Sequence, residues 1–102
     1  NLHVDDVCTA CLAFYERPRT AAIYNLGGGR ANSLSVLEAI SRFEQLFGKQ
    51  ARIEYVEQAR RGDHICYISD LRRFKTDYPS WQVSKSLDNI LLDFEQAYAA
   101  AA

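Results

Sequence analysis

Two apolar patterns alternate along this chain, and their order constrains its fold more than any other feature. Strand-like runs are expected at residues 2–4, 22–26 and 52–56, and helical stripes at residues 5–17, 33–47, 70–75 and 86–97. Strands that alternate with helices favour a parallel sheet with crossover connections. We therefore expect an α/β fold with about three short, mainly parallel strands and four helices. Three strands make a thin sheet, which indicates that strand partners lie outside this chain.

Boundary residues support two of the expected helices. Ser35 and Glu38 stand three residues apart, as in a capping box, although Ser33 competes as the N-cap. Gly48 is well placed to end the same helix. Pro18 predicts that the first helix ends at or before residue 17.

The third expected helix is the shortest. Ser69 or Asp70 is expected to cap its start, and Pro79 is expected to stop it. We expect Trp81, the only tryptophan, to fill the core beneath the turn that follows.

Composition narrows the classes of function. The 102 residues fit one domain, and 48% are hydrophobic, as in ordinary globular proteins. Twelve basic against thirteen acidic residues give a net charge of −1, which argues against a nucleic-acid partner. No apolar run reaches the roughly 20 residues that cross a bilayer, and no secretory signal is visible. Three cysteines, an odd number, favour reduced thiols and a cytoplasmic location.

The two ends of the chain suggest a larger protein. The sequence lacks methionine and opens directly on a strand-like run, so we expect a segment upstream. Residues 1–98 are interpreted as one folded portion. Residues 99–102 are an alanine tail to which we assign no function.

Cys8 and Cys11 form a C-x-x-C pair, the spacing found in redox and zinc sites. Zinc needs two more ligands, and only Cys66, His3 and His64 are available, at no recognisable spacing. The pair also lies on or beside the apolar face of an expected helix. Small buried thiols are the favoured interpretation.

A second cluster, His3 with Asp5 and Asp6, contains residue types used in acid–base catalysis. No nucleophile accompanies them in a known arrangement. Helix capping by the aspartates and packing by the histidine explain the cluster adequately.

Three consecutive glycines, residues 27–29, stand between an expected strand and an expected helix. Such a segment can cradle a phosphate. Its spacing does not match the G-x-G-x-x-G dinucleotide fingerprint. A tight turn that needs backbone freedom is the favoured interpretation.

The segment 60–63, Arg-Arg-Gly-Asp, is the best candidate binding site. An arginine fork can grip a phosphate through two parallel hydrogen bonds. Gly62 allows a turn that brings Asp63 to the same ligand, where its carboxylate can accept hydrogen bonds from ribose hydroxyls. A solvated charge cluster on a surface loop is the alternative, and spacing alone does not decide between them.

Four motifs in order resemble the C-terminal portion of the extended short-chain dehydrogenase/reductase family, the NAD-dependent nucleotide-sugar epimerases and dehydratases. They are His-Val-Asp-Asp-Val at 3–7, Tyr-Asn-Leu-Gly-Gly-Gly at 24–29, Arg-Arg-Gly-Asp at 60–63 and Ser-Asp-Leu at 69–71. The run 61–70, with Tyr-Pro-Ser-Trp at 78–81, most resembles the CDP-paratose (CDP-tyvelose) 2-epimerase branch. The resemblance covers nearly the whole chain apart from the alanine tail.

The resemblance implies that Arg60 contacts a nucleotide diphosphate and that Asp63 contacts its ribose. It also implies an N-terminal Rossmann domain that binds NAD and carries a Tyr-x-x-x-Lys pair, neither of which is in this chain. Residues 1–98 would then be the C-terminal substrate-binding portion of a cytoplasmic isomerase, inactive alone and binding no cofactor itself.

Other interpretations remain open. One is a stand-alone module that binds a phosphate ligand or another protein, and a distant third is a small zinc or redox protein. Uncovered apolar strand edges would also allow the chain to associate with itself.

Overall fold

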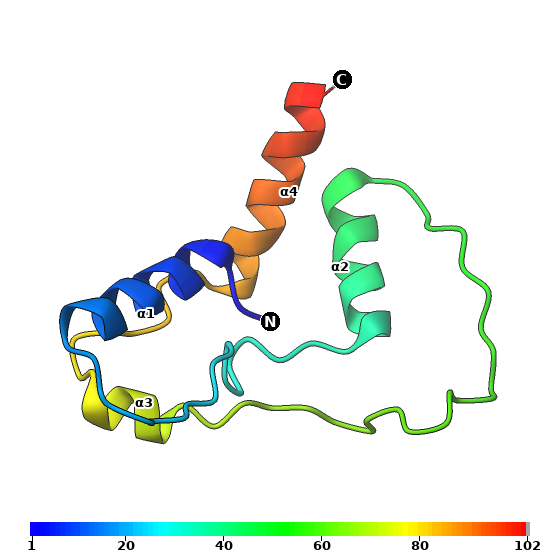
Figure 1. Cartoon of the computed structure of the whole chain (residues 1–102). Helices are drawn as coiled ribbons and strands as arrows, with labels where there is room; N and C mark the ends of the chain where they lie inside the picture. The colour runs from blue at the N-terminus through cyan, green and yellow to red at the C-terminus, as the bar shows by residue number, and fades with distance from the viewer. Residues whose placement is uncertain (102) are drawn as a thin grey trace. The chain divides into compact units, whose positions relative to one another are not determined.

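The computed structural model describes residues 1–101 and contains four helices (Figure 1). They are α1 (Val4–Glu16), α2 (Val36–Phe47), α3 (Arg72–Asp77) and α4 (Leu87–Ala101). The chain divides into two units. The first combines Asn1–Ser33 with the chain from Ile68 onward, and the second is Leu34–Tyr67.

The expected α/β class is wrong, because residues 1–101 contain no strand. A strand is stable only when its N–H and C=O groups pair with a neighbouring strand, and none lies beside these runs. Residues 22–26 still alternate, with Tyr24 and Leu26 half-buried and Ile23 exposed. Residues 52–56 are exposed throughout. The apolar alternation in these two runs therefore does not correspond to a sheet.

The first expected strand, residues 2–4, instead leads into α1, which begins at Val4. His3 is the N-cap, and its Nδ1 accepts a hydrogen bond from the main-chain N–H of Asp5 at 3.0 Å. The Nε2 atom of His3 lies 2.8 Å from a carboxylate oxygen of Asp93 on α4. One side chain thus caps α1 and contacts the last helix.

The predicted helix ends are confirmed where local chemistry sets them. Ser35 and Glu38 form both bonds of a capping box, at 3.1 and 2.8 Å. Gly48 ends α2 with a φ of +62°, a left-handed conformation that favours glycine. Helix α1 ends at Glu16, before Pro18. No side chain makes a cap bond at Leu71, the N-cap of α3.

The core lies in the first unit. Its members are Ala10, Leu71, Phe74, Tyr78 and Trp81, with Ala13, Tyr24, Leu26 and Val83 packed around them. Trp81 is 6% exposed, as predicted, and its indole N–H donates to Thr9 Oγ1 at 3.1 Å. Aromatic edge-to-face contacts fill the centre, including Phe74 with Trp81 at 4.9 Å between ring centroids.

The second unit has no core of its own. None of residues 34–67 is buried. Large apolar side chains there, including Ile53, Tyr55, Ile65 and Tyr67, are exposed. Because exposed apolar area of this kind is costly in water, we infer that this unit gains stability when another surface covers it.

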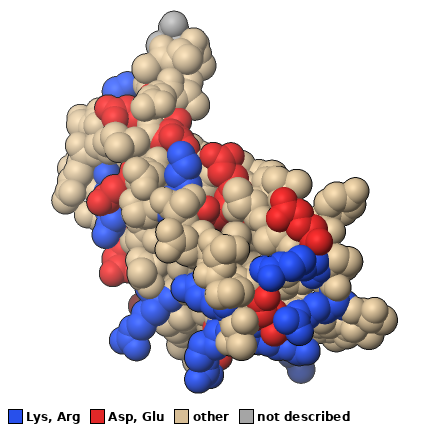
Figure 2. Space-filling view, turned by 90° about the vertical axis from the view of Figure 1, so that its left-hand side faces the viewer, with Lys and Arg blue, Asp and Glu red and all other residues tan. Residues whose placement is uncertain are grey.

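Surface charge is mixed in sign. Figure 2 shows side chains of both signs on the face in view, with the basic ones most frequent in its lower part. This agrees with the net charge of −1.

Over residues 1–101, no helix is both long and apolar enough to span a bilayer.

Candidate functional site

The loop of residues 57–67 carries the two predicted site residues. A turn closes at 60–63, where the N–H of Asp63 donates to the carbonyl oxygen of Arg60 at 3.1 Å. Gly62 has a φ of +86°, which a residue with a side chain rarely adopts. The glycine therefore lets the chain reverse and brings residues 60 and 63 to the same side, as the spacing predicts.

Arg60 and Asp63 meet in a two-pronged ion pair. The Nε atom of Arg60 donates to one carboxylate oxygen of Asp63 at 3.1 Å, and a terminal guanidinium nitrogen donates to the other at 2.9 Å. The fork that is expected to grip a phosphate thus grips the neighbouring carboxylate. The structure brings the two residues together and orients them toward each other.

Because this ion pair is exposed, another anion can readily replace the Asp63 carboxylate on the Arg60 guanidinium. The Arg60 side chain is 88% exposed and that of Asp63 is 43% exposed. Exposed ion pairs contribute only about 0–1 kcal/mol, because water screens the charges. A dianionic phosphate, which the same fork binds in the same geometry, can therefore displace the carboxylate at low cost.

The loop supplies polar groups but no enclosing walls of its own. Within the loop, the rings of His64 and Tyr67 lie 6.1 Å apart between centroids. All residues from 57 to 67 are exposed. The second unit alone therefore cannot exclude water from a ligand at Arg60.

The other sequence candidates are not arranged as reaction centres. Cys8, Cys11 and Cys66 are exposed, so the expectation of buried thiols for the pair Cys8 and Cys11 is wrong. In α1 the side chains of Cys8 and Cys11 are exposed, whereas Ala10 is buried in the core. No group of three metal-binding side chains gathers within residues 1–101.

Asp6 is a structural anchor. Its carboxylate is fully buried and accepts hydrogen bonds from Ser84 N–H, Ser84 Oγ and Lys85 N–H at 2.5–3.1 Å. Burial by itself would raise the pKa of Asp6, but these hydrogen bonds outweigh it and the pKa lies below 3.8. Sequence reasoning placed Asp6 at the helix cap and missed this tie to residues 84–85.

The glycine triplet serves close packing. A side-chain carbon on Gly28 would lie 1.6 Å from the carbonyl oxygen of Asn1, and one on Gly27 would lie 2.3 Å from Ser69 Oγ. Gly29 has a φ of +67°, and its N–H donates to Ser69 Oγ at 3.0 Å. The interpretation as a tight turn is confirmed. The alternative of a helix-end phosphate cradle fails, since α2 begins only at Val36.

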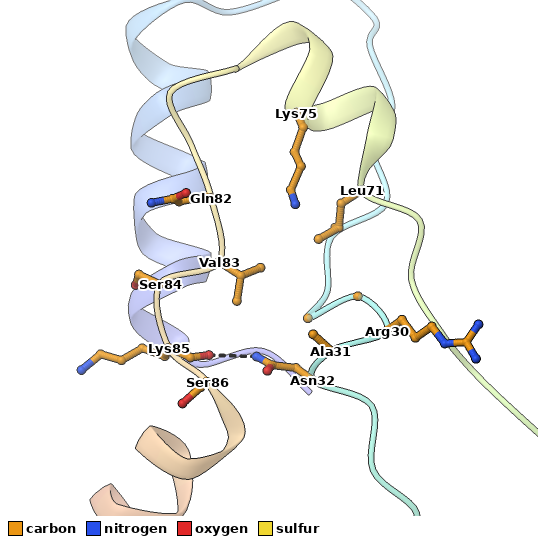
Figure 3. Close-up of a pocket in the computed structure, with 12 residues that line it drawn as sticks. Arg30, Ala31, Asn32, Leu71, Lys75, Gln82, Val83, Ser84, Lys85 and Ser86 are labelled. Carbon is orange, nitrogen blue, oxygen red and sulfur yellow. Dashed lines mark hydrogen bonds between the residues drawn. The ribbon is translucent and has the colours of Figure 1, made fainter.

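A cavity of about 450 Å³ opens in the first unit, lined by three short segments (Figure 3). The first is residues 28–32, and the third is residues 82–86. The second is Leu71, which directly precedes α3, together with Lys75 in α3. Sequence reasoning missed this cavity because its walls come from segments that are far apart in the chain. No spacing motif joins them.

No protein-family model matches the chain, and no solved structure matches it.

Proposed function

We propose that this chain is the C-terminal nucleotide-sugar-binding part of an NAD-dependent sugar epimerase of the CDP-sugar 2-epimerase type. The ordered resemblance of four motifs supports the family. The single structural observation behind the site is the convergence of Arg60 and Asp63, 2.9 Å apart, on one exposed turn. The chain's own task in this proposal is to hold the nucleotide handle while chemistry takes place on the attached sugar.

The binding step follows from the donors and acceptors of the loop. The diphosphate replaces the Asp63 carboxylate on the Arg60 fork, since both ligands accept two parallel N–H bonds. The freed carboxylate then accepts hydrogen bonds from the ribose hydroxyls. Binding energy from an unreacting handle positions the sugar, which is how remote groups contribute to a rate.

NAD does not fit the residues of this chain. The glycine segment packs against Asn1 and Ser69, and no strand precedes it among residues 1–101. A dinucleotide site needs a strand, a glycine turn and an immediate helix. In this proposal a Rossmann domain upstream supplies the NAD site.

Binding of CDP, UDP and dTDP to the purified chain tests the proposal. Amide chemical shifts recorded during each titration should change in residues 57–67. Arg60→Ala should weaken CDP binding at least about tenfold, since it removes a charged hydrogen bond. Arg52→Ala, which removes an exposed arginine of the same unit, is the matched control and should leave the affinity unchanged. Equal affinities for the parent and Arg60→Ala would contradict the proposal.

The second candidate, a stand-alone module for a phosphate ligand or a protein partner, is favoured by the exposed apolar side chains of the second unit. The same titrations separate the two. A module that recognises only the phosphate groups should bind inorganic pyrophosphate as tightly as CDP. The proposed function requires a preference for the nucleoside diphosphate, because Asp63 needs a ribose.

A further inference from the structure

The cavity of the first unit is cationic. Its twelve lining residues include Arg30, Lys75 and Lys85 and no aspartate or glutamate. Its volume of about 450 Å³ lies within the range of small-molecule sites, ~300–1,000 Å³. A cavity that collects positive side chains and excludes acidic ones attracts anions.

Lys75 is the cation that enters the cavity. In Figure 3 its side chain extends from α3 into the space between Leu71 and Val83, whereas Lys85 and Arg30 lead away on opposite sides. The Lys75 ammonium makes no ion pair or side-chain hydrogen bond with residues 1–101. The Lys85 ammonium lies 3.9 Å from an Asp5 oxygen. Lys75 therefore has three donors available to a ligand, while Arg30 and Lys85 add charge at the rim.

The opposite wall is held in place by hydrogen bonds. Asn32 is buried, and its Nδ2 donates to the carbonyl oxygen of Lys85 at 2.8 Å, which ties the glycine-rich wall to residues 82–86. Asp6 fixes Ser84 and Lys85 from behind. The main-chain N–H groups of Arg30 and Ala31 donate no hydrogen bond within the described chain. The Asn32–Lys85 bond thus joins two walls of the cavity, and Asp6 fixes one of them from behind.

We propose that this cavity binds the phosphate group of a small phosphorylated molecule, with Lys75 as its direct cationic contact. The site uses none of the residues of the Arg60 turn, so it goes beyond the function proposed above. Leu71 and Val83 offer an apolar side to whatever the phosphate carries. A long polyanion fits less well, because the chain carries a net charge of −1 and no basic excess.

Amide chemical shifts during titration with inorganic pyrophosphate test this site at low ionic strength. Shifts of Gly28, Gly29, Ala31 and Val83 should report binding in the cavity. Lys75→Gln should weaken that binding about tenfold, as expected when a charged hydrogen bond is lost. Lys75 is exposed, and its ammonium makes no ion pair or hydrogen bond within residues 1–101, so the variant should fold normally.

Two variants complete the design. Lys75→Arg keeps the charge and should retain most of the affinity. Lys49→Gln makes the same chemical change in the second unit and should alter nothing at the cavity amides. Arg60→Ala should also leave the cavity amides responsive, so this proposal can fail while the nucleotide proposal holds, and the reverse. Equal pyrophosphate affinity for the parent and Lys75→Gln, or shifts confined to residues 57–67, would overturn it.

Discussion

Ser84 donates both its main-chain N–H and its hydroxyl to the buried carboxylate of Asp6, 78 positions earlier in the chain. This contact fixes the segment before α4 against α1. It also holds one wall of the Lys75 cavity. One acidic residue in the first turn of a helix therefore organises both the fold of the first unit and its candidate site.

Asp6→Asn should lower the free energy of unfolding by about 2–3 kcal/mol. The carboxylate accepts hydrogen bonds at both oxygens, whereas the asparagine amide has one oxygen and one NH₂ group, and that NH₂ group would face the N–H donors of residues 84 and 85. Urea unfolding followed by circular dichroism measures the loss. Asp5→Asn, the exposed neighbour, is the matched control and should cost less than about 1 kcal/mol. Equal losses for the two variants would show that Asp6 is only a helix-end charge.

The same carboxylate makes stability depend on acid pH. The folded pKa of Asp6 lies below its ordinary value of 3.8, so its contribution is fully present above that pH and is lost as the pH falls through the folded pKa. The difference in unfolding free energy between the parent and Asp6→Asn should therefore shrink below pH 3.8. A difference that stays constant down to acid unfolding would contradict the assignment.

We expect the Tyr24 phenol to lose its proton at a higher pH than an ordinary tyrosine. Burial raises its pKa, and a 2.6 Å hydrogen bond to Asp77 raises it further, to about 12 from 10.0. A raised pKa means that the neutral phenol stabilises the fold below pH 10.0 and that this contribution is lost as the pH rises through about 12. Ultraviolet titration of the parent minus Tyr24→Phe isolates the group. In Asp77→Asn the midpoint should move down toward 10.0, and an unchanged midpoint would rule out the hydrogen bond as a cause.

Gly28→Ala should destabilise the first unit by about 2–3 kcal/mol, since the new methyl group would overlap the main chain at Asn1 and Asn32 Cβ. Gly62→Ala is the comparison. A methyl group there meets nothing within 4 Å, so only the strain of a positive φ remains, about 1–2 kcal/mol within an exposed loop. Thermal unfolding of both variants measures the two costs. A smaller loss at Gly28 than at Gly62 would contradict the packing of the glycine segment.

Sequence reasoning succeeded where neighbours along the chain set the structure. The Ser35–Glu38 capping box, the Gly48 helix end and the stop before Pro18 are all decided within a few residues. The turn that joins residues 60 and 63 is equally local.

It failed where structure depends on distant partners. The runs at 22–26 and 52–56 have the apolar alternation of strands, yet a strand forms only beside another. Burial of Asp6 depends on Ser84, 78 positions away, and the cavity around Lys75 combines residues 28–32 with residues 71–86, which no spacing rule brings together. Exposure of Cys8 and Cys11 likewise depends on which face of α1 meets the core.

We propose above all that Arg60 binds the diphosphate of a nucleotide. Affinities for CDP and for cytidine test this most directly. Cytidine keeps the base and ribose and lacks only the phosphates. Arg60→Ala should weaken CDP binding about tenfold or more and leave cytidine binding within about twofold, since only CDP offers the fork an anion. Equal losses for both ligands, or none for CDP, would contradict the account.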